Sequence, residues 1–221
     1  MKSLIALMPL FFLAQVHAAD TAATGGGTPA SAEPTHRYLI ERTFPKGALD
    51  GLDAATKQKV NANNATVGVR WVQSFANADK TKTFCVYEGP NEASIRKAAK
   101  LNALPVDRIT EVPVDLDAGH SAKAMPVSNS VPAGKHRRFL VERTFAPGAL
   151  DGLDAAGKVK VNSTNDKFGV TWVKSYANAD RTKTYCVYEG PSEVAVRQAA
   201  KANGIPVDRV MEVPVTLLPT L

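Results

Sequence analysis

Residues 68–90 read GVRWVQSFANADKTKTFCVYEGP, and they contain two runs typical of β-strands with a short polar turn between them. The same pattern returns 101 residues later, over residues 169–191. An alignment of residues 36–115 with residues 137–216 needs no gap, and 52 of the 80 pairs are identical. A repeat of this length indicates a duplicated domain, because the repeating units of solenoid proteins are only about 20–50 residues long.

Each repeat is predicted to run strand, helix, strand, strand, helix, strand. In the first repeat a strand over residues 37–44 precedes a helical pattern over residues 49–67, the strand pair follows, and a second helix opens at Asn91. The last strand is predicted over residues 109–114, and Pro113, which has no N–H donor, is expected to place it at a sheet edge or end it early. This order is that of the ferredoxin-like sandwich, in which two helices cover one face of a four-stranded antiparallel sheet. The predicted fold class is therefore α+β, with two tandem ferredoxin-like βαββαβ sandwiches whose free sheet faces pack together as a pseudo-dimer.

The chain is predicted to divide into five segments: a signal peptide (1–18), a flexible tether (19–35), the first repeat (36–116), a linker (117–135) and the second repeat (136–221). The leader has a positive start, an apolar run and a small-residue cleavage site, Val16-His17-Ala18. The sequence therefore predicts a periplasmic or secreted protein, cleaved after Ala18. The apolar run is too short to span a bilayer as a helix, so no membrane contact is expected after leader cleavage.

The charge pattern argues against nucleic acid as a partner. The sequence has 27 basic and 21 acidic residues and a net charge of +6. Its basic residues alternate with acidic ones, as in Glu41-Arg42 and Asp107-Arg108. A nucleic-acid surface favours a basic stripe with exposed aromatic residues, so the composition indicates a basic exported protein without such a surface.

Three glutamates of each repeat lie on different predicted strands and are candidate metal ligands: Glu41, Glu88 and Glu111, with their twins Glu142, Glu189 and Glu212. Carboxylates on adjacent strands can converge on a metal ion or a cationic ligand. The alternative is that they pair with arginines such as Arg42 and Arg108, or face water. Neighbours on a strand point to opposite faces, so only one of Glu41 and Arg42 can reach a given pocket.

A second set of candidates suits a small organic ligand: Arg42, Trp71 and Tyr87, with their twins Arg143, Trp172 and Tyr188. A tryptophan in the middle of a strand packs in a core or lines a ligand cleft. In this alternative the pocket lies between the two sheet faces. Cys85 and Cys186 leave three alternatives open: buried thiols, an interdomain disulfide, or a metal or redox role. The sequence has no hydrolase, thioredoxin-like or phosphate-binding signature, which favours a non-catalytic protein.

Four blocks of the first repeat together resemble a known family: YLIERTFP (38–45), GVRWV (68–72), FCVYEGP (84–90) and LPVDRITEV (104–112). They closely resemble a bacterial family of small single-domain proteins of unknown function, labelled nickel-binding-protein-like, with a ferredoxin-like fold. The resemblance covers both repeats and implies a divalent metal such as nickel as the ligand. Nickel favours imidazole among protein ligands, yet neither repeat has a histidine within these blocks. A site built from His36 and His136 stays open, because both precede first strands.

Three hypotheses follow. The first is an exported non-catalytic protein that binds a divalent metal such as nickel. The second is a protein that binds, or oxidises, a small organic molecule between paired sheets. The third is a structural or protein-interaction module. The expected partner is a metal ion or a small molecule, and the expected assembly is a pseudo-dimer or a homo-oligomer.

Overall fold

Both repeats fold in the predicted order of elements in a computed structural model, which describes residues 35–119 and 137–220. The first repeat comprises β1 (His36–Thr43), α1 (Ala54–Ala65), β2 (Arg70–Ala76), β3 (Lys82–Gly89), α2 (Glu92–Leu101), β4 (Arg108–Glu111) and β5 (Val114–Asp117). The second comprises β6 (Arg137–Thr144), α3 (Ala155–Asp166), β7 (Thr171–Ala177), β8 (Lys183–Gly190), α4 (Glu193–Ala202), β9 (Arg209–Glu212) and β10 (Val215–Leu217). Several predictions fall outside the described residues: the signal peptide, the tether up to residue 34, the linker from residue 120 onward, and His136.

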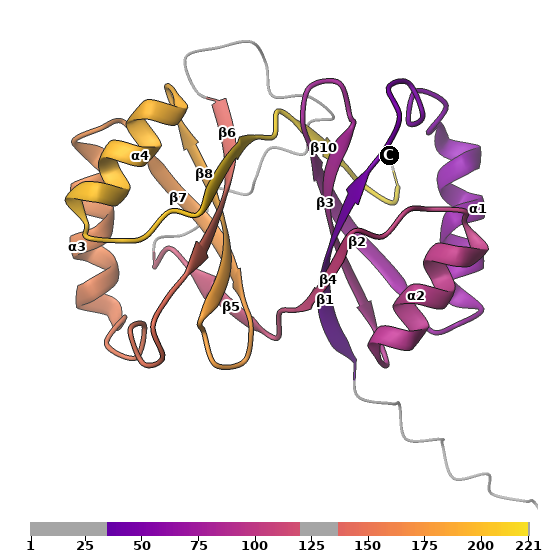
Figure 1. The fold of residues 1–221 in the computed structure, drawn as a ribbon, viewed down its shortest axis with the longest axis horizontal. Helices are drawn as coiled ribbons and strands as arrows, with labels where there is room; N and C mark the ends of the chain where they lie inside the picture. Colours follow the sequence, from indigo (N-terminus) through magenta and orange to yellow (C-terminus); the bar gives the residue numbers. More distant parts are fainter. Residues whose placement is uncertain (1–34, 120–136, 221) are drawn as a thin grey trace, which may run out of the picture. The chain divides into compact units, whose positions relative to one another are not determined.

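The strands form two five-stranded antiparallel sheets, ordered β10-β2-β3-β1-β4 and β5-β7-β8-β6-β9. Helices α1 and α2 cover one face of the first sheet, and α3 and α4 cover one face of the second (Figure 1). The fold is thus two tandem ferredoxin-like sandwiches, as predicted. Among the described residues, no helix combines the length and the apolar character needed to cross a membrane.

The fifth strand of each sheet comes from the other repeat. β5 pairs with β7, and β10 pairs with β2. The predicted four-stranded sheet is therefore wrong in this respect, because each sheet has five strands. The expected effect of Pro113 is confirmed, because β4 lies at the sheet edge and ends at Glu111. Pro113 and its twin Pro214 have no N–H to donate, and each interrupts the last strand. β4 and β9 stay in their own sheets, whereas β5 and β10 continue into the opposite sheets.

Helix α1 begins five residues later than the pattern predicted, because Asp53 caps it. The Asp53 carboxylate accepts a hydrogen bond from the Thr56 backbone N–H at 2.7 Å, which satisfies one free donor of the first helical turn. Residues 46–51 form turns instead of helix. Asp154 caps α3 in the same way, through the Gly157 N–H at 2.8 Å.

Three apolar cores hold the elements together. Two lie between a sheet and its own helices. The third contains residues of both repeats: Leu39, Phe75, Phe84, Val86 and Val112 with Leu140, Tyr176, Tyr185, Val187 and Val213. The inner faces of the two sheets therefore pack together, as predicted. Cys85 and Cys186 belong to different helix-side cores and are free buried thiols, so the disulfide alternative is wrong.

Candidate functional site

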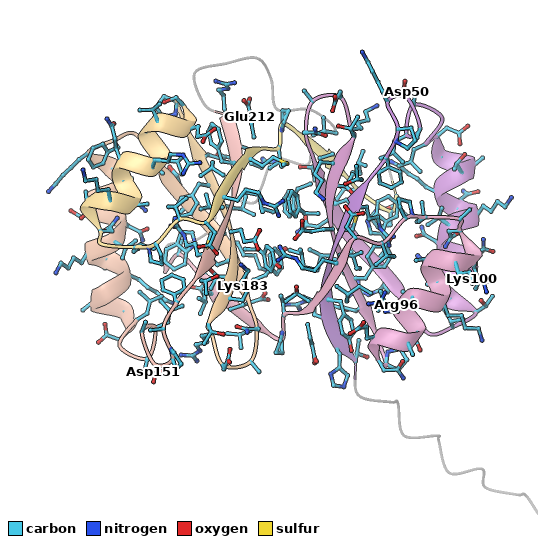
Figure 2. All side chains as sticks on the ribbon, in the orientation of Figure 1. Asp50, Arg96, Lys100, Asp151, Lys183 and Glu212 are labelled. Atoms are coloured by element: carbon cyan, nitrogen blue, oxygen red, sulfur yellow. The ribbon has the colours of Figure 1, made fainter. Side chains whose placement is uncertain are left out.

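The two glutamates Glu41 and Glu142 meet at the contact between the repeats, where they form a cluster of alternating charges. Arg209 donates hydrogen bonds to both carboxylates, each at 2.7 Å. Arg108 also donates to both, and its bond to Glu142 measures 2.5 Å. Lys183, which lies at the start of β8 (Figure 2), is 2.6 Å from Glu142. This arrangement matches the alternative in which the glutamates pair with arginines.

Hydrogen bonds in this cluster stabilise the ionised carboxylates. Burial works to raise the pKa of the Glu142 carboxyl, but donors from Lys183 and Arg108 outweigh it and hold that pKa below its ordinary value. Asp208 accepts a hydrogen bond from Thr144 at 2.6 Å and lies 3.1 Å from Lys183, and both contacts lower the pKa of Asp208. Glu142 and Asp208 are therefore ionised in the folded protein at neutral pH.

The other predicted metal ligands lie away from this cluster. Glu88 is paired in register with Arg37, four residues along β1 from Glu41, or about 13 Å. Glu111 is opposite Tyr38, so it points to the helix-covered face. There its carboxylate is 2.6 Å from the His36 imidazole.

The second repeat repeats this separation. Glu189 accepts a hydrogen bond from Arg138 at 3.0 Å, and Glu212 pairs with Arg137, which replaces His36. Within residues 35–119 and 137–220, no group of three or more metal-binding side chains is suitably arranged. A metal site on the six glutamates stays a prediction.

The predicted ligand-binding residues, by contrast, come together in each repeat. Arg42, Trp71 and Tyr87 line one cavity of about 40 Å³. Their twins Arg143, Trp172 and Tyr188 line a second cavity of about 50 Å³. These cavities lie between each sheet and its helices, not between the sheet faces as predicted. The reason is strand alternation, because Arg42 and Tyr87 share the face of Ile40 and Cys85 in the helix-side core.

A β-bulge in β2 completes the pocket wall. Trp71 pairs with Tyr87 and Ser74 pairs with Cys85, so the register shifts by one residue between them. The bulge places Trp71 and Ser74 on the same face although they are three residues apart. The Trp71 indole N–H then donates to the Ser74 hydroxyl at 3.0 Å. β7 repeats this arrangement (Trp172 to Ser175, 2.9 Å).

The buried arginines are the most polar groups of the pockets. Arg42 donates to the Pro105 carbonyl, and Arg143 donates to the Pro206 carbonyl at 2.5 Å. Their guanidinium carbons lie 5.6 and 5.4 Å from the ring centroids of Tyr87 and Tyr188. Burial raises the pKa of Tyr188 to about 12, and it also raises that of Tyr87, so both phenols stay neutral.

Each pocket is closed by a residue from the other repeat. Leu217 of β10 lines the cavity of the first repeat, and Leu116 of β5 lines that of the second. Neither residue was predicted. Each lies on a strand that pairs with the sheet of the other repeat (strand exchange), and the periodicity of one repeat cannot reveal such a pairing. Ser74 and Thr83, which also line the first cavity, were missed as well.

Between the two repeats, the residues that line the cavities are more similar than the other buried residues. Eleven of the twelve lining positions have the same residue in both repeats, and only Leu104 and Ile205 differ. Buried aromatic positions elsewhere exchange Tyr with Phe, as in Tyr38 and Phe139 or Phe84 and Tyr185. This internal comparison could have pointed to the pocket from the sequence alone.

A groove on the surface of the second repeat adjoins its cavity. The groove has a volume of about 660 Å³ and is lined by the turn before α3, by α3 itself and by the segment after α4. It shares Phe145, Leu150, Leu153, Val161 and Ile205 with the cavity. Pockets of about 300–1,000 Å³ are typical of small-molecule sites.

Fold and pockets define a class: a tandem ferredoxin-like protein with two equivalent helix-side cavities. The family model described as "Nickel responsive protein SCO4226-like" matches both repeats, over residues 38–112 and 139–213. The chain therefore belongs to the SCO4226-like nickel-responsive protein family and contains two copies of its domain. This confirms the resemblance predicted from the four sequence blocks.

The chain is also similar to solved structures of other proteins. SCO4226 from Streptomyces coelicolor A3(2) is 20% identical over 35% of this chain and 96% of its own, with a TM-score of 0.31. Chlorite dismutase from Candidatus Nitrospira defluvii, solved with imidazole, is 9% identical over 83% of this chain and 90% of its own, with a TM-score of 0.40. A comparison with curated proteins finds no match.

The donors around the predicted glutamates do not fit a shared nickel ion. Glu41 and Glu142 are bound by cationic side chains, and Glu88 is bound by Arg37 and Arg70. Within the described part of the chain, the His36 imidazole does lie in contact with a carboxylate, that of Glu111. Arg137 occupies the corresponding place in the second repeat and cannot ligate a metal.

Proposed function

We propose that this protein is an exported, non-catalytic binding protein whose two equivalent sites take a small organic molecule. The observation that carries the proposal is the pair of cavities lined by Arg42, Trp71 and Tyr87 and by their twins. An apolar concave site with a few converging polar groups is the usual form of a ligand site.

The closed cavities are small compared with an organic ligand. An engineered cavity of roughly 150 Å³ holds benzene, about three times the volume found here. We infer that a ligand places one end in the cavity and, in the second repeat, the rest along the adjoining groove. Entry then requires the turn before α1 or α3 to move aside.

The test is a thermal-shift and calorimetric screen of small organic compounds on residues 19–221. Binding is expected with two sites per chain. Val60→Phe and Val161→Phe fill one cavity each from the helix side, so each is expected to remove one site. Val159→Phe is the matched control, because Val159 is 67% exposed. Binding that neither cavity-filling variant alters would contradict the proposal.

Export is supported by the leader sequence of residues 1–18. The mature protein recovered from the periplasm or the medium is expected to begin at Ala19. Intact mass spectrometry checks this, and a full-length chain in the cytoplasm would contradict it.

A divalent metal such as nickel is the second candidate ligand. Family membership and the contact between His36 and Glu111 favour it. Calorimetric titration of nickel is expected to show one site, which His36→Arg removes by reproducing the arrangement of the second repeat. Glu193→Gln, an exposed carboxylate change, is the control. Nickel binding that His36→Arg does not change would place the metal elsewhere.

A further inference from the structure

Each pocket contains a buried positive charge that no carboxylate in the described part of the chain balances. Arg42 and Arg143 are each 2% exposed. Each donates to one backbone carbonyl and lies over a tyrosine ring, and each also contacts that tyrosine's hydroxyl, with Arg143 in contact with the Cys186 thiol as well. These partners are neutral, so none of them balances the charge. The Nε atoms of both side chains have no hydrogen-bond partner within residues 35–119 and 137–220.

Burying an arginine away from carboxylates is costly. Arginine does not lose its proton inside proteins, so it cannot avoid the charge by neutralising. A buried charge is normally paired or fully hydrogen-bonded. The repetition of the same incomplete arrangement in two pockets argues that an incoming group completes it.

The pocket walls favour an anion as that group. Among the residues that line the two cavities, Arg42 and Arg143 are the charged ones. The groove of the second repeat adds one further charged residue, Lys160, which is also a cation. Among residues 35–119 and 137–220, no carboxylate lines either cavity or the groove of the second repeat, so none of these walls repels a negative ligand.

We propose that the two pockets bind an organic monocarboxylic acid, with its carboxylate on Arg42 or Arg143, its apolar body against the tryptophan and, in the second repeat, its far end along the groove. The inference rests on the proposed function and names the chemical class of its ligand. A carboxylate matches the planar guanidinium, which can donate two parallel hydrogen bonds to it. One negative charge balances one arginine, whereas a phosphate dianion would leave charge unpaired among apolar walls.

The first experiment compares acids with neutral molecules of the same shape. Hexanoate and benzoate are titrated into residues 19–221 by calorimetry, alongside hexanamide and benzamide. Each acid is expected to bind at two sites and at least tenfold more tightly than its amide. The preference for the acid is expected to hold from about pH 6 to pH 8, because carboxylic acids ionise near pH 4–5.

The second experiment removes the charge from one pocket at a time. Arg143→Met is expected to leave one site for hexanoate, and the double variant with Arg42→Met is expected to leave none. The variants are expected to melt no lower than the wild type without ligand, because methionine fills a similar space without a buried charge. A purely structural arginine would give a lower melting temperature instead. Arg70→Thr is the control, because it removes an exposed arginine and inserts the residue found in the second repeat.

The outcomes separate this inference from the proposed function. Equal binding of hexanoate and hexanamide, or hexanoate binding that survives in the double variant, overturns the organic-acid inference. The two-pocket proposal would still hold in that case if some other organic compound bound the protein and Val60→Phe and Val161→Phe together abolished its binding. Failure of both acids to bind at millimolar concentration also overturns the inference. If the methionine variants do not fold, Arg42→Lys and Arg143→Lys keep the charge. They are expected to weaken both acids tenfold and to retain the preference over amides.

Discussion

Glu41 and Arg42 are adjacent in the chain and serve two different sites. Glu41 points to the inner face, where two arginines hold it. Arg42 points to the helix-side cavity, where the described residues offer it no counter-ion. Strand alternation alone separates them, so a change at one position tests one site without touching the other.

At this scale, loss of one carboxylate is expected to destabilise the contact between the repeats. Glu142→Gln leaves Arg108, Arg209 and Lys183 with fewer negative partners. We expect the free energy of unfolding to fall by about 1–3 kcal/mol, less than for a fully buried pair, because water screens the half-exposed arginines. Urea unfolding measures this. Glu193→Gln, which breaks an exposed helical pair, is expected to change the value by under about 0.5 kcal/mol.

The same carboxylates make stability depend on pH. The pKa values of Glu142, Asp107 and Asp208 are lowered in the folded protein. Their contribution is therefore complete above the ordinary values, 4.5 for Glu and 3.8 for Asp, and is lost as the pH falls through the lower folded values. Urea unfolding at stepped pH is expected to show constant stability from about pH 6 to 8 and a decline below about pH 4. Asp208→Asn is expected to make the free energy of unfolding fall less steeply below about pH 4. An unchanged dependence on pH in this variant would contradict the role of Asp208.

At the scale of elements, the sequence predicts the position of each strand and the face to which its side chains point. It does not predict the bulge in β2 or the pairing of strands between the two repeats. Alternating residue patterns locate β1, β2 and β3, and the same alternation assigns Arg42 and Glu41 to opposite faces of the sheet. The bulge at Trp71 changes the alternation by one residue, and no residue type marks it. The destination of β5 after Pro113 depends on free edges in another repeat, so periodicity within one repeat could not reveal it.

Strand exchange predicts that pocket mutations act on the opposite repeat. Leu217 lines the cavity of Trp71, and Leu116 lines the cavity of Trp172. Leu217→Ala is expected to increase acrylamide quenching of Trp71 fluorescence, measured in a Trp172→Phe background. Leu116→Ala is expected to do the same for Trp172 in a Trp71→Phe background. An effect of Leu217→Ala on Trp172 alone would contradict the exchange.

At the scale of the whole molecule, neither repeat has a complete sheet of its own. β2 needs β10 at its edge, and β5 has no place in the sheet of the first repeat. Residues 35–119 expressed alone are expected to form a dimer that exchanges β5 between two copies. Light scattering after size exclusion measures this. A stable monomer that unfolds cooperatively would show that the exchanged strand is dispensable.

Because both repeats belong to one chain, the exchanged strands are expected to stay paired when the protein is diluted. Two separate chains that exchange strands come apart when their concentration falls below their dissociation constant. Here the partner strand belongs to the same chain as the sheet that accepts it, so its pairing is intramolecular and does not depend on the protein concentration. The pockets closed by Leu116 and Leu217 therefore stay closed at any protein concentration. For the binding function proposed above, ligand affinity is therefore expected to be independent of the protein concentration.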